Sequence, residues 1–140
     1  MLMTQRGLIR ALKRGISLDC QLELAMPWLF GAAALDDRER AKALRERLLD
    51  NPAPPTLEEM ERQYPVLAEF DAAAYLPRIS APTLVIISED DIIALPRESE
   101  KLAAGIAGAR IARLPGGHVS QFEEPEKLAE AIGKFLAVPS

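Results

Sequence analysis

The chain has 140 residues, of which 49% are hydrophobic, and this is enough for one ordinary globular domain with a core. Its formal net charge is −4 and its basic residues alternate with acids, so we expect no nucleic-acid-binding surface. With one histidine and one cysteine, Cys20, we expect no disulfide framework, no metal and no cofactor, and a reducing, cytoplasmic compartment. The longest apolar runs are far too short to cross a membrane.

The first half of the chain is expected to form a layer of helices. Apolar residues recur at helical spacing over 4–15, which predicts an amphipathic surface helix that ends near Gly15, rather than a transit peptide. A second helix is expected over 18–26. The aromatic corner that follows contains Trp28 and Phe30. Such a corner is typical of a packing anchor, and it serves as a substrate contact as well if it lies at a cleft.

A third helix is predicted over 38–49, where either Asp36 or Asp37 offers the N-cap. One side of this segment carries a dense mixture of charges, which is typical of a solvated face. The other side carries a narrow apolar stripe at Ala41, Leu44 and Leu48. We therefore expect the stripe to face the core.

A fourth helix follows a proline-rich break. Thr56 and Glu59 have the spacing of a capping box, which predicts a helix over 57–63. We expect Pro65 to bend or end this helix, because proline has no backbone N–H and clashes with the preceding turn. Another short helix is expected around 70–76, before a linker rich in proline leads into the second half.

The second half changes from helical periodicity to an alternation of strands and helices. A continuous β-branched run at 84–87 predicts a strand buried in a parallel sheet, and a second short strand is predicted at 110–114. A helix that starts at Pro96 should connect them, which requires a parallel pair with a right-handed crossover. The last helix should start at Pro125 and bury Leu128, Ile132, Phe135 and Leu136.

Each predicted strand is followed by one titratable side chain, Asp91 after the first and His118 after the second. Ligands of open parallel sheets bind beyond the carboxyl ends of the strands, so the two side chains are expected to meet there. A carboxylate that accepts a hydrogen bond from a histidine ring fixes the tautomer of a general base. Two alternatives stay open: Asp90 could replace Asp91, or these residues are turn residues beside an exposed loop histidine.

The segments around this pair carry further motifs. LPRISAPTLVIISEDDIIALP places Asp91 three residues after Ser88 and shortly before a proline, and LPGGHVSQFEEPEKLAEAIGKFL places His118 after two glycines and before Glu-Pro and an apolar helix. Residues 76–136 thereby resemble the C-terminal part of an α/β-hydrolase, whose acid loop usually has glycine where Ser88 stands. The resemblance implies that Asp91 and His118 are the acid and the histidine of a catalytic triad.

The resemblance also implies an organisation for the whole chain. Residues 1–70 are similar to the helical cap of the subgroup that includes 3-oxoadipate enol-lactonase and the aminoacrylate hydrolase of pyrimidine breakdown, and 71–140 to the end of the core. The expected fold class is α/β: a helical layer followed by a strand-helix-strand-helix unit with a two-stranded parallel sheet. In this arrangement Trp28 and Phe30 would contact a small-molecule substrate.

One part of the family pattern is absent from the sequence. The family places its nucleophilic serine in a G-x-S-x-G turn, and no such motif occurs here. Ser17 lacks the second glycine, and Cys20 is in a helix-like stretch that is typical of a packed thiol. The oxyanion-hole segment of the family is missing too. We therefore expect a hydrolase half that supplies two of three triad members and is inactive alone.

The expected partners follow from the same reasoning. Two strands leave both sheet edges and a broad apolar face uncovered, so we expect self-association or docking onto an N-terminal hydrolase half. A small-molecule ester or lactone would be the substrate of the complemented enzyme. The alternatives are a non-catalytic binding or oligomerisation module derived from a hydrolase, and an enzyme with an unconventional nucleophile.

Overall fold

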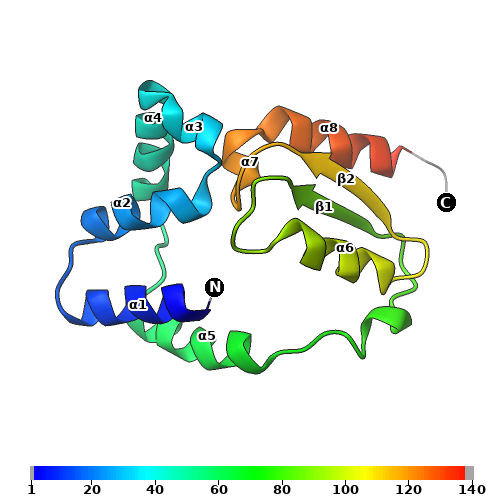
Figure 1. Cartoon of the computed structure of the whole chain (residues 1–140), viewed down its shortest axis with the longest axis horizontal. Helices are drawn as coiled ribbons and strands as arrows, with labels where there is room; N and C mark the ends of the chain where they lie inside the picture. The colour runs from blue at the N-terminus through cyan, green and yellow to red at the C-terminus, as the bar shows by residue number, and fades with distance from the viewer. Residues whose placement is uncertain (1, 138–140) are drawn as a thin grey trace.

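The computed structural model describes residues 2–137, which form a group of helices on one side and a small α/β unit on the other (Figure 1). In chain order the elements are α1 (Leu2–Lys13), α2 (Leu18–Leu29), α3 (Ala32–Asp36), α4 (Arg38–Leu49), α5 (Leu57–Glu69), the 3-10 turn η1 (Leu76–Arg78), β1 (Leu84–Ser88), α6 (Pro96–Ala104), β2 (Arg110–Leu114), α7 (Ser120–Glu123) and α8 (Pro125–Leu136). None of the helices in this described part is long and apolar enough to cross a membrane.

The helical group has a core of its own where α2, α3 and α4 meet. Its buried members are Met26, Phe30, Ala34 and Leu44. Ala41 and Leu48 of α4 pack against this core, as the predicted apolar stripe requires. Val119 and Phe122, from the segment after β2, pack against it as well. The core of the helical group therefore extends into the α/β unit, next to the loop that carries the histidine.

Side-chain caps mark the starts of three helices in this group, α2, α4 and α5. Asp37, rather than Asp36, caps α4, because its carboxylate accepts hydrogen bonds from the backbone N–H groups of Glu39 and Arg40, both at 3.1 Å. The predicted capping box of α5 is confirmed. The N–H of Glu59 donates to the Thr56 hydroxyl at 3.2 Å, and the N–H of Thr56 donates to the Glu59 carboxylate at 2.7 Å.

Two helices run past prolines near which the sequence predicted an end at 26 and a bend or an end at Pro65. α2 continues through Pro27 to Leu29, and α5 continues through Pro65 to Glu69. Pro27 lies in the last turn of α2, where the lost N–H donor removes a single hydrogen bond. In α5 the packing of α1 along the helix supports its second half. Tertiary contact thus outweighs the local cost of proline.

The short helix expected around 70–76 is not formed. In its place the side chain of Asp71 accepts a hydrogen bond from the backbone N–H of Ala73 at 2.9 Å, which makes a turn. The 3-10 turn Leu76–Arg78 follows and leads to the strand. A local side-chain bond to the backbone therefore competes successfully with a helix at this point.

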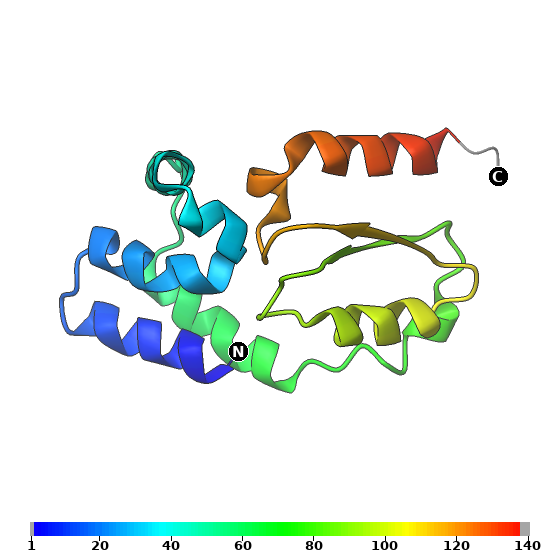
Figure 2. The same cartoon turned by 45° about the horizontal axis from the view of Figure 1, so that its top comes forward.

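The sheet consists of β1 and β2 in parallel, with Leu84 opposite Arg110 at the start of the register. Helix α6 makes the crossover between the strands, as predicted. Val85 and Ile87 of β1 are buried with Ala103 of α6 in a second small core. Figure 2 shows the sheet between two helices, with α8 over one face and α6 over the other.

The prediction that α8 buries four apolar residues is wrong. Ile132 is 39% exposed and Leu136 is 73% exposed, while Leu128 and Phe135 are half-buried. Of the two strands, β2 packs more closely against α8, and the guanidinium of Arg110 lies 5.4 Å from the centre of the Phe135 ring. A sheet of two strands is too narrow to cover the whole apolar face of this helix.

Candidate active site

Asp91 lies in the loop after β1, and its carboxylate is fixed in orientation. The oxygen Oδ1 accepts hydrogen bonds from the backbone N–H groups of Ile93 at 2.8 Å and Ala94 at 2.9 Å. The side chain is 9% exposed. With one oxygen held by the loop, the other oxygen, Oδ2, points to a single partner.

That partner is His118. Its Nδ1 lies 3.0 Å from Oδ2 of Asp91. With Asp91 ionised, the contact favours the tautomer in which Nδ1–H donates, and this leaves Nε2 as a proton acceptor. The histidine side chain is 37% exposed, so its free edge is accessible. Asp90, the alternative acid, is exposed and makes its contact through its backbone.

The two loops meet because the strand pairing continues beyond the strands. The N–H of Glu89 donates to the carbonyl of Leu114 at 2.9 Å, and the N–H of Asp90 donates to the carbonyl of Gly116 at 3.0 Å. Gly116 has φ +100, a conformation that side chains disfavour, and it turns the chain after β2. Strand pairing and this turn bring Asp91 and His118 together at the carboxyl end of the sheet.

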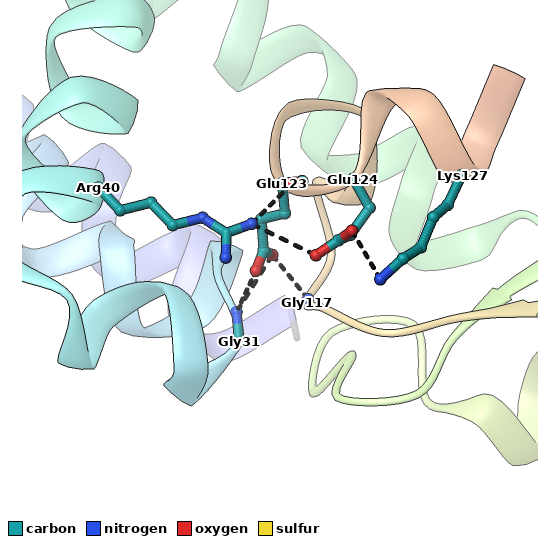
Figure 3. Close-up of polar contacts among 6 residues, drawn as sticks. All are labelled: Gly31, Arg40, Gly117, Glu123, Glu124 and Lys127. Carbon is teal, nitrogen blue, oxygen red and sulfur yellow. Dashed lines mark hydrogen bonds and ion pairs between the residues drawn. The ribbon is translucent and has the colours of Figure 1, made fainter.

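Glu123 is a site residue that the sequence reasoning missed. It is 8% exposed, and its carboxylate accepts hydrogen bonds from the N–H of Gly117 at 2.7 Å and the N–H of Gly31 at 3.1 Å (Figure 3). Gly117 directly precedes His118, and Gly31 belongs to the helical group. The signal in the sequence was the acidic residue beside the Glu-Pro motif, but a motif does not show that the partners of this residue are backbone groups.

A cluster of charges lies beside this carboxylate (Figure 3). Arg40 donates to the backbone carbonyl of Glu123 at 2.7 Å and approaches the carboxylate of Glu124 at 3.4 Å. Lys127 pairs with the same Glu124 carboxylate at 2.9 Å. The hydrogen bond from Lys127, supported by Arg40, holds the pKa of Glu124 below its ordinary value, and desolvation opposes this shift.

Comparison with curated proteins gives relatives that match part of the chain. A protein from Stutzerimonas stutzeri that bears the name carbamate hydrolase RutD is 38% identical over 85 residues, which are 60% of this chain and 32% of that protein. A protein of the same name from Pseudomonas savastanoi pv. phaseolicola is 34% identical over 83 residues, which are 59% of this chain and 32% of that protein. No protein-family model matches the chain.

Solved structures match almost the whole chain. A hydrolase from Pseudomonas aeruginosa gives a TM-score of 0.78 at 26% identity, over 98% of this chain and 51% of that one. The enol-lactonase from Burkholderia xenovorans gives 0.77 at 27%, over 92% and 49%. An α/β-hydrolase from a deep-sea metagenome, MGS-M2, gives 0.78 at 24%, over 99% and 51%.

The fold is that of the C-terminal half of an α/β-hydrolase. The chain spans about half the length of these solved structures and 32% of the curated relatives that it matches. The expected fold class is thus confirmed, including the two-stranded parallel sheet. The identities lie between 24% and 38%, so the reaction has to be argued from the residues of the site.

A cleft of about 500 Å³ opens where the helical group faces the acid loop. Phe30 and Leu35 line it from the helical group, and Asp91, Ile92 and Leu95 line it from the loop after β1. The cleft therefore combines apolar walls with the acidic residues Glu89, Asp90 and Asp91, of which Asp91 is committed to the histidine. Such a mixture is typical of small-molecule sites.

Of the two predicted substrate contacts, the structure brings only one to this cleft. Phe30 is 4% exposed and lines the cleft while it anchors the core of the helical group. Trp28 is 42% exposed and is not part of the cleft wall. The reason is the continuation of α2 beyond residue 26, because neighbouring positions of a helix point in different directions.

The nucleophile candidates that the sequence offered lie at the far end of α2. Ser17 caps this helix, and its hydroxyl accepts a hydrogen bond from the N–H of Cys20 at 3.3 Å. The other end of α2 reaches the histidine loop, where the carbonyl of Leu29 accepts from the N–H of Val119 at 3.1 Å. A helix of 12 residues is about 18 Å long, so neither Ser17 nor Cys20 is placed to use His118 as a base.

Proposed function

We propose that this chain supplies the acid–base half of an α/β-hydrolase active site that acts on small ester-like or lactone-like substrates. His118 is the general base and Asp91 orients it. The observation that carries the proposal is the 3.0 Å contact between Nδ1 of His118 and Oδ2 of Asp91 at the carboxyl ends of adjacent parallel strands. The nucleophile and the oxyanion donors come from outside these 140 residues, so the chain alone is inactive.

The geometry defines what the pair does in this reaction. Nε2 of His118 accepts the proton of a serine hydroxyl as its oxygen attacks the substrate carbonyl. The positive charge that forms on the imidazole is stabilised by the Asp91 carboxylate, whose other oxygen is held by Ile93 and Ala94. The imidazolium then returns the proton to the leaving group. A water molecule then attacks the acyl group on the serine, and His118 transfers the proton of this water to the serine oxygen as the acid product leaves.

The substrate class is supported by the cleft and by the relatives. A volume of about 500 Å³ with walls that include Phe30, Leu35 and Leu95 suits a small, largely apolar molecule. The related proteins are named for carbamate and enol-lactone chemistry, and these compounds share a carbonyl that is attacked by a nucleophile. We therefore assign carbonyl substrates of the ester or lactone kind.

The partner that we propose is an N-terminal hydrolase half or a second copy of the chain. Large apolar side chains are exposed on the helical group, where Val66 is 63% and Phe70 is 69% exposed. On the α/β unit Ile111 is 47% exposed and Leu136 is 73% exposed. Association would cover these side chains and pair the strand edges. The compartment that we propose is the cytoplasm, where Cys20 stays a free thiol.

The same exposed surface supports a second candidate, a non-catalytic binding or oligomerisation module. Replacement of His118 by alanine separates the two functions. A module that works by association keeps its partner in H118A, because the histidine lies in the loop and not on the exposed apolar faces. An acid–base half keeps the partner but loses the reaction.

The test is complementation with the N-terminal half of a related hydrolase, purified separately and mixed with this chain. We expect hydrolysis of p-nitrophenyl acetate to appear with the complex and to be absent from either part. H118A should abolish it, and Asp91→Asn should lower the rate on the order of 10⁴-fold, because the histidine loses its preferred tautomer. Asp90→Asn is the matched control and should lower the rate far less, because the Asp90 side chain lines the cleft but does not bind His118.

A complex that forms, as measured by gel filtration, but hydrolyses no ester would contradict the proposed function. Equal rates for D91N and D90N would contradict the assignment of Asp91. Activity of this chain on its own, blocked by a fluorophosphonate, would contradict the proposal that the nucleophile lies elsewhere.

A further inference from the structure

We propose that Glu123 is a positioning residue that ties the orientation of His118 to the packing of the helical group. The claim concerns the geometry of the histidine loop, and only its consequence for catalysis rests on the proposed function. The carboxylate of Glu123 is buried, because this residue is 8% exposed, and it lies five residues after the histidine. Burial of a charged group is costly unless hydrogen bonds replace its water, so its partners define its role.

The backbone on both sides of His118 is held by hydrogen bonds. The N–H of Gly117 donates to Oε1 of Glu123 at 2.7 Å, and the N–H of Val119 donates to the carbonyl of Leu29 at 3.1 Å. The residues on both sides of the histidine are therefore anchored through their backbone N–H groups. These hydrogen bonds constrain the position of the His118 Cα independently of the contact between its side chain and Asp91.

The same carboxylate binds the helical group. The N–H of Gly31 lies 3.1 Å from Oε1 and 3.3 Å from Oε2 of Glu123 (Figure 3). Gly31 follows α2 and is 86 residues before Gly117 in the chain (117 − 31). One side chain thus joins two backbone segments that have no sequence proximity, and the histidine loop follows any movement of the helical group.

The glycines of the motif before His118 are explained by this arrangement. A Cβ on Gly117 would lie 2.7 Å from the backbone N of Gly31 and 2.7 Å from the carbonyl oxygen of Leu29. A Cβ on Gly116 would lie 3.2 Å from the carboxylate of Glu123, at a residue whose φ is +100. Only glycines let the loop approach the carboxylate and the end of α2 so closely.

The alternative is that Glu123 contributes to stability alone. The two roles differ in what happens to the imidazole of His118. If Glu123 positions the loop, its loss moves Nδ1 away from Asp91, and the ring returns to the tautomer mixture of a free histidine. If Glu123 only stabilises the fold, a folded variant keeps the wild-type tautomer.

The test uses the imidazole of His118 as the reporter, because the sequence contains one histidine and its signals need no further assignment. Long-range ¹H–¹⁵N NMR correlation of the neutral ring identifies which nitrogen carries the proton. In the wild type we expect the Nδ1-protonated form to predominate. Glu123→Ala removes the oxygens that accept from the N–H groups of Gly117 and Gly31, so in this variant we expect the population to shift toward the Nε2-protonated form.

Glu126→Ala is the matched control, since it removes one exposed carboxylate from the same segment. It should keep the wild-type tautomer. A folded E123A chain with the wild-type tautomer would overturn the proposal, and so would an equal shift in E126A.

If E123A does not fold, hydrogen exchange of the wild type still tests whether Glu123 holds the two backbone segments. Hydrogen exchange of the Gly31 and Gly117 amides should then be strongly slowed, because both N–H groups bind the buried carboxylate. Exchange of these amides at the rate of an unstructured peptide would overturn the proposal. None of these readouts needs turnover, so a failure here differs from a failure of the ester assay, which tests the proposed function.

Discussion

Three charged side chains meet where α8 begins, and one of them makes stability depend on pH. Lys127 and Arg40 lower the pKa of Glu124 from its ordinary value of 4.5. A carboxylate whose pKa is lowered by folding stabilises the fold above its unfolded pKa, and this stabilisation is lost as pH falls through the folded pKa. The contribution is small, since the pair of Lys127 and Glu124 is partly exposed.

We therefore predict that Glu124→Gln makes the free energy of unfolding depend less on pH. The wild type should be more stable than E124Q near neutral pH, and the difference should close below the ordinary pKa of 4.5. Urea unfolding of both chains, from neutral pH to below pH 4.5, measures this difference in stability. A difference that persists unchanged in acid would mean that the ion pairs of Glu124 do not cause it.

At this scale the sequence predicts some site residues and not others. The positions of Asp91 and His118 follow from strand ends, because parallel strands present their carboxyl ends at one edge. The role of Glu123 cannot be predicted this way, since its partners are the N–H groups of Gly31 and Gly117, which every non-proline residue has. The exposure of Trp28 could not be predicted either, because it depends on how far α2 continues.

At the scale of single elements, the α/β unit depends on a small core under the sheet. Ile87 of β1 is 1% exposed and Ile111 of β2 is 47% exposed, although both are isoleucines in paired strands. We predict that Ile87→Ala lowers the free energy of unfolding by about 2–5 kcal/mol, because it leaves a cavity. Ile111→Ala, the matched control, should cost about 1 kcal/mol or less, since little area is lost there. Equal losses in urea unfolding would contradict the burial of β1.

The elements themselves were predicted with uneven success, and the reasons are physical. The strand 110–114 was predicted with its bounds, because a short run with apolar residues between turn-forming residues is a local signal. The continuation of α5 past Pro65 was not, because it depends on the packing of α1. The burial of Ile132 and Leu136 was also predicted wrongly, since an apolar stripe does not state how wide a sheet lies beneath it.

At the scale of the whole molecule, the uncovered apolar surface leads to a prediction about assembly. We expect the chain to self-associate with rising concentration, measured by sedimentation velocity under reducing conditions. Ile111→Lys should weaken this association, because a charge on an exposed strand opposes edge pairing. Cys20→Ser is the control for disulfide-linked dimers, since the thiol is exposed. A monodisperse 15.3 kDa monomer with a cooperative melt would contradict the prediction.

The division of the chain into 1–70 and 71–140 stays a prediction, but the structure makes its parts interdependent. Val119 and Phe122 of the second part pack into the core of the first, and Glu123 binds Gly31. A boundary drawn from composition marks where helical periodicity stops. It does not mark where packing stops, because that depends on contacts between residues far apart in the chain.

The parallel pair of strands with α6 between them has a consequence for how such sites are inherited. Residues 83–123 are one uninterrupted segment that contains Asp91, His118 and Glu123, together with the hydrogen bonds between β1 and β2. A gene that is cut, fused or permuted outside this segment keeps the spacing of these three residues. The anchors of the histidine loop at Leu29 and Gly31 lie outside it, so recombination that moved this segment alone would carry the acid and the base but leave those two contacts behind.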